Sequence, residues 1–422
     1  MKSARSFVAL TMGSLLLLPL GVATTAPAAA APHEGVVGES PVGWTPHVLD
    51  GSVKDILRIG DTVVVAGEFD RVSDSSGDGV HDRRNLFAFR HGSGEILEDF
   101  APSVDRAVNS LAEGPDGTVV LGGDFHQVNG ESSRGVARID TTAGDTVDEF
   151  DAAVGDGNVY RLASDGTDVY LGGNFSAVNG ESRTGLARVD ATDGSLDAGF
   201  TPTISEQRRG TLRVQELALS PDGRRLAING TFTKVDGEDR YQIAMIDTGS
   251  GGLTPWSTSA YEAPCDYERM HTYMRQMDFS PDGSYFAVVT AGGPRVKPGL
   301  CKSTARFEND STANAEPTWT NLTGGDSLYS VEVTSGAVYV GGHQRWMDNE
   351  EGALNPGPGS VEREGIAAVD PISGRALAWN PGRARGHGAE ALHATSDGLY
   401  VGSDTERLGG ARHARLGMFP AS

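Results

Sequence analysis

The chain carries a sequence repeat with a period of about 50 residues. Residues 120–131 (VLGGDFHQVNGE) recur as residues 170–181 (YLGGNFSAVNGE), and weaker copies lie at 66–69, 229–237 and 339–343. Short apolar runs separated by Gly and Asp turns, repeated at this length, are typical of β-propellers, in which each repeat forms one small sheet. The repeat therefore predicts an all-β fold.

Each repeat divides into four expected strands. In the second repeat these are residues 107–112, 118–121, 135–139 and 147–152. Pro-Asp-Gly turns, as at residues 115–117, are expected to join the first strand to the second, because Asp-Gly pairs between apolar runs form tight turns. An aromatic residue marks the fourth strand of six repeats: Phe100, Phe150, Phe200, Trp256, Trp319 and Trp379.

The two ends of the chain are expected to meet in one sheet. The last repeat begins at Ala389 and has room for only three strands, whereas the segment around Trp44 has the pattern of an isolated fourth strand. Closing the ring in this way leaves no long open edge. We therefore expect residues 32–422 to form one seven-bladed β-propeller of four-stranded blades, closed by this N-terminal outer strand.

The Gly-Gly-x-Phe, Val-Asn-Gly and Gly-Leu-Ala-Arg-Val-Asp motifs resemble the delta-60 repeats of secreted bacterial β-propellers. The segment from Tyr339 to Met347, together with residues 379–382, is similar to actinobacterial members in particular. The resemblance covers nearly all of the chain after residue 31 and implies the fold. It lends no catalytic residues, because the family has no established activity.

The N-terminus has the pattern of a secretory leader. Lys2 and Arg5 precede an apolar stretch at residues 7–22, and the small residues 28–31 offer a cleavage site near Ala31. No other long apolar run follows, so we expect a secreted, extracellular monomer without a membrane span. In an oxidising compartment Cys265 and Cys301 are expected to form a disulfide, with two free thiols as the alternative.

The charge balance excludes one class of partner. The chain has 35 basic and 57 acidic side chains, a formal net charge of −22. Such a surface repels phosphate backbones, so sequence-independent nucleic-acid binding is not expected.

Features that recur in every repeat are expected to be structural. An Arg precedes the third strand repeatedly, and we expect it to make ion pairs or hydrogen bonds between blades: Arg84, Arg134, Arg183, Arg240 and Arg363. Side chains that occur once are more informative about function. Several of them fall in loops that leave the same face of the last three blades, where a ligand site would find convergent polar groups.

The candidate ligand-binding residues on this loop face are His271, Asp326, His343, Arg345, Trp346, His387 and Asp404, with the segment 383–387 beside them. An aromatic ring beside a planar guanidinium suits a saccharide or a polypeptide strand. The alternative is that the last blades have only drifted in sequence, with no ligand.

The insertion at residues 74–82 resembles the start of a calcium loop. Oxygen donors recur at alternate positions and Gly79 permits a sharp turn, although the bidentate Glu of such loops is replaced by Asn85. The candidate calcium ligands are Asp74, Ser76, Asp78, the Val80 carbonyl and Asp82. A solvated loop without a cation is the alternative.

The function predicted from the sequence is a binding or interaction module for an extracellular or cell-envelope saccharide or protein. The alternative from another class is a polysaccharide-directed hydrolase or lyase that uses Asp326 with Asp404 or Glu406, since a glycosidase needs two facing carboxylates. No motif of an acyl-transfer nucleophile and no paired zinc-binding His supports catalysis, so we expect no enzyme. A third possibility is a structural wall-associated protein.

Overall fold

The computed structural model describes Met1 and residues 33–422, except 264, 266–269, 293–298 and 311. The predicted leader, apart from Met1, therefore lies outside the described residues. Those residues form β-strands and loops, with a single 3-10 turn at Pro115–Gly117. The predicted all-β fold is confirmed.

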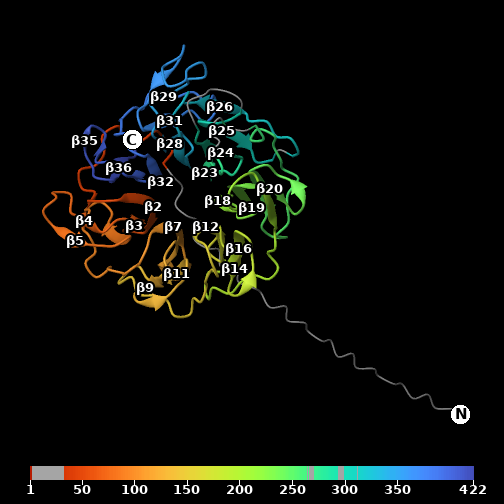
Figure 1. The fold of residues 1–422 in the computed structure, drawn as a ribbon. Coiled ribbons are helices and arrows are strands. Elements are labelled where there is room, and N and C mark those ends of the chain that lie inside the picture. Colours follow the sequence, from red (N-terminus) through yellow and green to blue (C-terminus); the bar gives the residue numbers. More distant parts are fainter. Residues whose placement is uncertain (2–32, 264, 266–269, 293–298, 311) are drawn as a thin grey trace.

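Small antiparallel sheets follow one another around a common centre (Figure 1). In each sheet the first strand lies innermost, the second pairs with it, and the third pairs with the second. The first strands are β2 (Ser52–Ile59), β7 (Val108–Glu113), β12 (Val159–Ser164), β18 (Val214–Leu219), β23 (Met274–Phe279), β27 (Leu328–Val333) and β32 (Ala389–Thr395). The second strands are β3 (Thr62–Glu68), β8 (Val119–Gly123), β13 (Asp168–Gly173), β19 (Arg225–Gly230), β24 (Tyr285–Thr290), β28 (Val338–Gly342) and β33 (Gly398–Ser403). The third strands are β6 (Leu86–Arg90), β11 (Val136–Ile139), β16 (Leu186–Asp190), β22 (Ile243–Asp247), β25 (Ser303–Glu308), β31 (Ile366–Val369) and β36 (Leu416–Pro420).

The predicted fourth strands are mostly shorter than expected. Only β26 (Trp319–Leu322) pairs as a full fourth strand in the described part of the chain. In the second repeat the expected strand 147–152 is reduced to one bridge, between Ile139 and Thr146. There the Phe150 N–H turns back to bond the Val147 carbonyl, so the chain leaves the sheet. The other three strands of this repeat lie within two residues of their predicted bounds.

The connections between second and third strands form small hairpins at the rim of the molecule (Figure 1). These hairpin strands are β4 (Arg71–Ser73) with β5 (Val80–Asp82), β9 (Gln127–Val128) with β10 (Glu131–Ser132), β14 (Ala177–Val178) with β15 (Glu181–Ser182), β20 (Phe232–Val235) with β21 (Glu238–Asp239), β29 (Trp346–Met347) with β30 (Val361–Glu362), and β34 (Arg407–Leu408) with β35 (Ala411–Arg412). Two further strands join them: β1 (His47–Val48) pairs with β4, and β17 (Ile204–Gln207) pairs with β20.

The segment that leads into each inner strand lies beside the hairpin of the same sheet. Bridges between Val104 and Val128, and between Arg383 and Leu408, place the two on one face. We call the surface formed by these hairpins and lead-in segments the loop face.

The hydrophobic core lies between neighbouring sheets. Val64 and Leu86 of one sheet pack with Leu111 and Leu121 of the next, and no water reaches Val64 or Leu121. The aromatic residue of each outer segment fills the same layer: the Trp379 ring lies 5.2 Å from the Phe419 ring and 5.4 Å from that of Tyr339. Burial of these side chains holds adjacent sheets together.

Side chains of the inner strands also tie each sheet to the next around the centre. Asp55 accepts the Leu111 N–H at 2.8 Å, Asp278 accepts the Val333 N–H at 2.6 Å, and Glu332 accepts the Ala394 N–H at 2.7 Å. His393 accepts the Arg58 N–H at 3.3 Å and thereby joins β32 to β2. The acceptor side chains Asp55, Asp278, Glu332 and His393 line a central cavity of about 220 Å³.

The first and last parts of the chain meet. The N-terminal segment runs beside β36, since the Gly38 N–H bonds the Pro420 carbonyl and the Val42 N–H bonds the Met418 carbonyl, both at 2.9 Å. Trp44 packs against the core of the β2–β3–β6 sheet, beside Phe89. The segment contributes backbone hydrogen bonds to the edge of β36 without being a regular strand.

The recurring arginines confirm the prediction only in part. Arg134 Nη1 donates to the Gly155 carbonyl in the lead-in segment of β12 and so bonds the next sheet, as expected. Arg183, Arg240 and Arg363 instead each donate to a backbone carbonyl of their own sheet's outer segment; for Arg363 the acceptor is the Leu377 carbonyl, 2.6 Å from Nη2. In the first repeat it is Arg83, not Arg84, that makes this bond within the sheet.

Candidate functional site

One group of polar side chains gathers on the loop face where the β27–β28–β31 and β32–β33–β36 sheets meet. We call it the polar cluster, and its members are Asp326, Tyr329, His343, Arg345, Arg383, Arg385, His387, Glu390 and Asp404. It includes five of the seven candidate ligand-binding residues. All of its members come from lead-in segments, strand ends or the first residues of the hairpins.

Asp326 is the centre of one half of the polar cluster. Its side chain is only 7% exposed, and both of its oxygens accept hydrogen bonds from arginines. Arg345 approaches with Nε 2.8 Å from Oδ2 and Nη2 3.4 Å from Oδ1, and Arg385 places Nη2 3.4 Å from Oδ1. Two guanidinium groups from different sheets thus share a single carboxylate.

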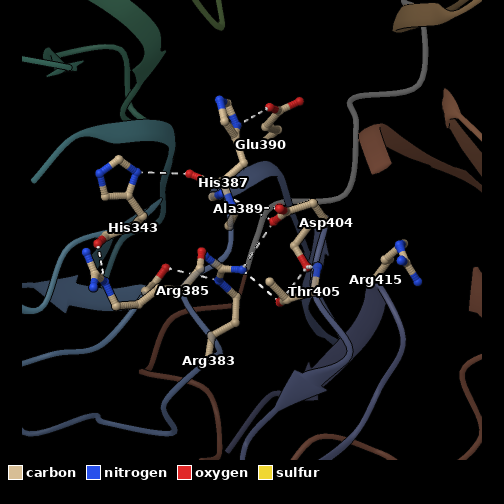
Figure 2. Close-up of polar contacts among 12 residues, drawn as sticks. His343, Arg383, Arg385, His387, Ala389, Glu390, Asp404, Thr405 and Arg415 are labelled. Atoms are coloured by element: carbon tan, nitrogen blue, oxygen red, sulfur yellow. Dashed lines mark hydrogen bonds and ion pairs between the residues drawn. The ribbon is translucent and has the colours of Figure 1, made fainter. Parts of the chain in front are cut away.

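A chain of hydrogen bonds links this half to the other (Figure 2). Arg385 Nε donates to the His343 carbonyl at 2.8 Å, and His343 Nδ1 lies 3.0 Å from the His387 carbonyl. Because the acceptors are backbone carbonyls, the guanidinium of Arg385 is fixed to the segment that follows β28, and the ring of His343 is fixed to the lead-in segment of β32.

Asp404 and Arg383 hold the lead-in segment of β32 in place. The Asp404 carboxylate accepts the N–H groups of His387 and Gly388 at 2.6 and 3.2 Å. Arg383, whose side chain is fully buried, lies 3.8 Å from Asp404 and donates to the Thr405 hydroxyl at 2.9 Å and the Gly342 carbonyl at 2.5 Å. Burial lowers the pKa of Arg383 to about 10, with Asp404 acting in the opposite direction.

An aromatic stack completes the polar cluster. The rings of Tyr329 and His387 lie 4.9 Å apart and 19° from parallel, and the Arg275 guanidinium sits 5.7 Å from the Tyr329 ring centre. His387 Nδ1 lies 3.0 Å from Glu390 Oε1 (Figure 2), and this hydrogen bond raises the pKa of His387. The His387 side chain is 64% exposed, so one face of its ring is open to a ligand.

Tyr329 and Glu390, which the sequence analysis missed, occupy equivalent positions. Each lies at the β-bulge where an inner strand begins, as do Lys54 and Asn109 in earlier sheets. Bulges redirect a side chain out of the sheet, which explains why these residues reach the loop face. The signal in the sequence is the bulge residue near the start of each inner strand, whose identity varies from repeat to repeat.

A second missed signal is the loss of the repeat's buried phenylalanine. Phe69, Phe125, Phe175 and Phe232 fill the same place in the first four repeats, whereas Gln344 and Thr405 replace it in the two sheets under the polar cluster. Gln344 is fully buried, and its amide has no hydrogen-bond partner among the described residues. Among these six repeats, the residue at this position is polar only in the two that carry the polar cluster.

Two predicted residues lie apart from the polar cluster. Trp346 is half-buried in β29, where its backbone pairs with Glu362, and its Nε1 is buried without a partner in the described chain. His271 is exposed on the lead-in segment of β23, and its carbonyl accepts a bond from Arg208 at 3.2 Å. Among the described residues, no hydrogen bond, ion pair or ring contact joins either side chain to the polar cluster.

The predicted calcium loop is closed by its own hydrogen bonds. Asp74 accepts the Ser76 hydroxyl at 2.7 Å and the N–H groups of Gly77, Asp78 and Gly79. These bonds lower the pKa of Asp74 to about 2. Val80 and Asp82 lie in β5 and are paired with β4. The described residues contain no group of three or more His, Cys, Asp or Glu side chains placed to hold a metal ion, and calcium binding stays a prediction.

A cavity of about 600 Å³ also opens on the loop face, over the first three sheets. Its lining is rich in carboxylates, among them Glu68, Asp70 and Asp124, with Arg84 and Arg106 at its edges. This cavity is not evident from the sequence, because its residues come from six separate segments that carry ordinary repeat motifs.

The predicted disulfide is present, with the Cα atoms of Cys265 and Cys301 5.8 Å apart and a sequence separation of 36. No helix among the described residues is long and apolar enough to cross a membrane.

Comparisons with known proteins agree with this architecture. A family model described as a domain of unknown function (DUF5122) beta-propeller matches residues 114–145 and 169–200. The crystal structure of the WD40 beta propeller domain of Doa1 is similar in fold, with a TM-score of 0.50 and 10% identity over 93% of this chain and 98% of that one. No curated protein matches the chain. The chain is thus a β-propeller repeat protein; at this identity the likeness defines the fold and nothing further.

Proposed function

We propose that this protein is a secreted binding module whose ligand, an extracellular saccharide or protein, docks on the polar cluster. The observation that carries the proposal is the convergence of Arg345 and Arg385, from different sheets, on the nearly buried carboxylate of Asp326. A rigid scaffold that presents preorganised donors on its loop face is suited to binding.

We further propose that the scaffold is one seven-bladed ring spanning residues 32–422. The inner strands listed above support this count, and contacts between β2 and β32 support closure. The backbone bonds from Gly38 and Val42 to β36 support the N-terminal segment as the closing element.

Secretion through a leader at residues 1–31 belongs to the same proposal. The disulfide supports it, since such bonds persist in oxidising compartments. The resemblance to delta-60 repeats of actinobacterial secreted propellers points the same way, and we propose that the mature chain acts as a monomer.

The geometry favours binding over the alternative of a hydrolase or lyase. Asp326 is occupied by two arginines, and Asp404 by two backbone N–H groups with Arg383 beside it. These donors occupy the oxygens of both carboxylates and hold them in place, whereas a glycosidase needs carboxyl oxygens that face its substrate. Both carboxylates therefore act as anchors for the loop face.

The test is a glycan-array and cell-envelope retention assay on the secreted chain and on Arg345→Ala, with Trp346→Ala assayed separately. Arg134→Ala is the matched control, because Arg134 lies on the same face but bonds the Gly155 carbonyl, which is outside the polar cluster. We expect specific retention that Arg345→Ala abolishes and the control keeps. Absence of retention on every glycan and envelope fraction, or equal retention by both variants, contradicts the proposal.

A further inference from the structure

The polar cluster is much less acidic than the molecule as a whole. Its three guanidinium groups, those of Arg345, Arg383 and Arg385, are balanced by the carboxylates of Asp326, Glu390 and Asp404, and the Arg275 guanidinium lies against the Tyr329 ring. The whole chain, in contrast, carries a formal charge of −22. A surface where guanidinium groups gather on such an acidic molecule is the place where a negatively charged group on a ligand is best tolerated.

Only two of these guanidinium groups are available to a ligand. The Arg383 side chain is fully buried, with its Nη atoms bound to Thr405, Gly342 and the Arg385 carbonyl. Arg345 and Arg385 are instead 32% and 35% exposed, and neither Nη1 atom has a hydrogen-bond partner in the described chain. Both arginines hold Asp326 through other nitrogens, so binding a ligand breaks no existing bond.

The free donors are preorganised. Arg345 is held by two bonds to Asp326, and Arg385 by one bond to Asp326 and one to the His343 carbonyl. Because the side chains are already fixed, little rotamer entropy is lost when a ligand binds. Paired planar guanidinium groups match a carboxylate better than a compact ammonium group would.

The neighbouring stack supplies an apolar surface for a ring. His387 lies against Tyr329, and its other face is open. The CH-bearing face of a sugar packs against such an aromatic surface while its substituents reach polar groups at the edge. An acidic polymer charged at every residue would be repelled by the rest of the surface, which favours an end group or an isolated charge.

Resting on the proposed binding function, we infer that the polar cluster recognises a uronic acid residue of a saccharide, with the carboxylate at Arg345 and Arg385 and the sugar face on His387.

The test compares methyl β-glucuronide and methyl β-galacturonide with their methyl esters, which keep the sugar and remove the charge. Binding to the full secreted chain is measured by NMR titration. Charge-assisted hydrogen bonds contribute about 1.5–3 kcal/mol, so we expect each bound acid to bind roughly 10- to 100-fold more tightly than its ester. In Arg345→Gln/Arg385→Gln this preference is expected to disappear, and in the exposed control Arg407→Gln it is expected to remain.

The outcomes separate this inference from the proposed function. If acid and ester bind equally, if neither acid binds, or if the double variant keeps the preference, the uronate inference is wrong. If in that case a neutral glycan or a protein is retained in the array assay and lost in Arg345→Ala, the binding function still holds. Loss of folding in the double variant is checked by its thermal unfolding; Arg345→Lys, which keeps the charge and loses the planar fork, then provides the second test, with a weakened preference expected.

Discussion

At the scale of single residues, one position shows how the repeat was changed to build the polar cluster. A phenylalanine fills the space behind the second strand in the first four repeats, and Gln344 and Thr405 take its place beneath the polar cluster. An unpartnered buried amide destabilises a fold, because its hydrogen bonds to water are lost without replacement. The protein retains this amide directly before Arg345 in the sequence, and Arg345 is the residue that bonds Asp326.

Gln344→Met is therefore expected to stabilise the protein. The substitution keeps the side-chain volume and removes an amide that lacks partners among the described residues, so the free energy of unfolding should rise by about 1–3 kcal/mol. Urea denaturation measures it. Gln242→Met is the matched control: that amide is also fully buried but bonds the Tyr261 carbonyl and the Thr272 hydroxyl, so it should lose stability. Destabilisation by both variants would show that the Gln344 amide has hydrogen-bond partners in the folded protein.

At the scale of elements, the inner strands combine two tasks. Their apolar residues pack between sheets, and their polar residues bond the backbone of the next inner strand around the central cavity. This arrangement buries several carboxylates together. Burial raises the pKa of Glu216 and of Asp278 to about 7, and burial with the nearby Asp278 carboxylate raises the pKa of Glu332.

These raised pKa values predict how stability depends on pH. The folded state holds a proton on Glu332 that the unfolded state, with a pKa near 4.5, releases; stability is therefore lost as pH rises from 4.5 through the raised pKa. Glu332→Gln keeps an acceptor for the Ala394 N–H and removes the charge. We expect the variant to be more stable than the parent near pH 8 and to differ less near pH 5. Thermal unfolding at both pH values measures this.

His393 acts in the opposite direction and provides an internal check. Burial lowers its pKa to about 4, so stability is lost as pH falls below 6.5, where the unfolded state gains a proton. Both proteins carry His393. Subtracting the parent's curve of stability against pH from the curve of Glu332→Gln therefore removes the His393 contribution. A difference that does not grow with pH would mean that Glu332 is ionised without cost in the folded protein.

At the scale of the whole molecule, the decisive contact is between the two ends of the chain. The N-terminal segment covers the edge of β36 and also donates the Val37 N–H to the Tyr339 hydroxyl at 3.0 Å. The Trp379 indole N–H reaches the Gly38 carbonyl at 3.1 Å. An uncovered strand edge at this position would be free to pair with another chain.

Deleting residues 33–44 is therefore expected to lower the melting temperature and to cause concentration-dependent association. Removal exposes the carbonyls of Met418 and Pro420, which now accept N–H groups from this segment. Calorimetry and size-exclusion chromatography measure the two effects. A synthetic peptide of residues 33–48 added in trans should restore the melting temperature. An unchanged melting temperature after deletion would mean that the segment does not close the ring.

The sequence by itself determined the repeat architecture. Apolar alternation and Asp-Gly turns are local signals, so the first three strands of the second repeat, the turn at Gly117 and the buried aromatic layer were predictable from single repeats. The pairing of Cys265 with Cys301 was predictable because no other cysteine exists. Five of the predicted ligand-binding residues gather in the polar cluster for a related reason: the repeat fixes the face on which each loop emerges.

Only the tertiary structure decided the rest. Trp346 and His271 lie on the expected face, yet their side chains take no part in the polar cluster, since loop position does not fix side-chain direction. Tyr329 and Glu390 reach it through bulges, which depend on hydrogen bonds between strands rather than on local sequence. The shared use of Asp326 by two arginines needs three loops from two sheets, and such convergence is set by packing around the ring.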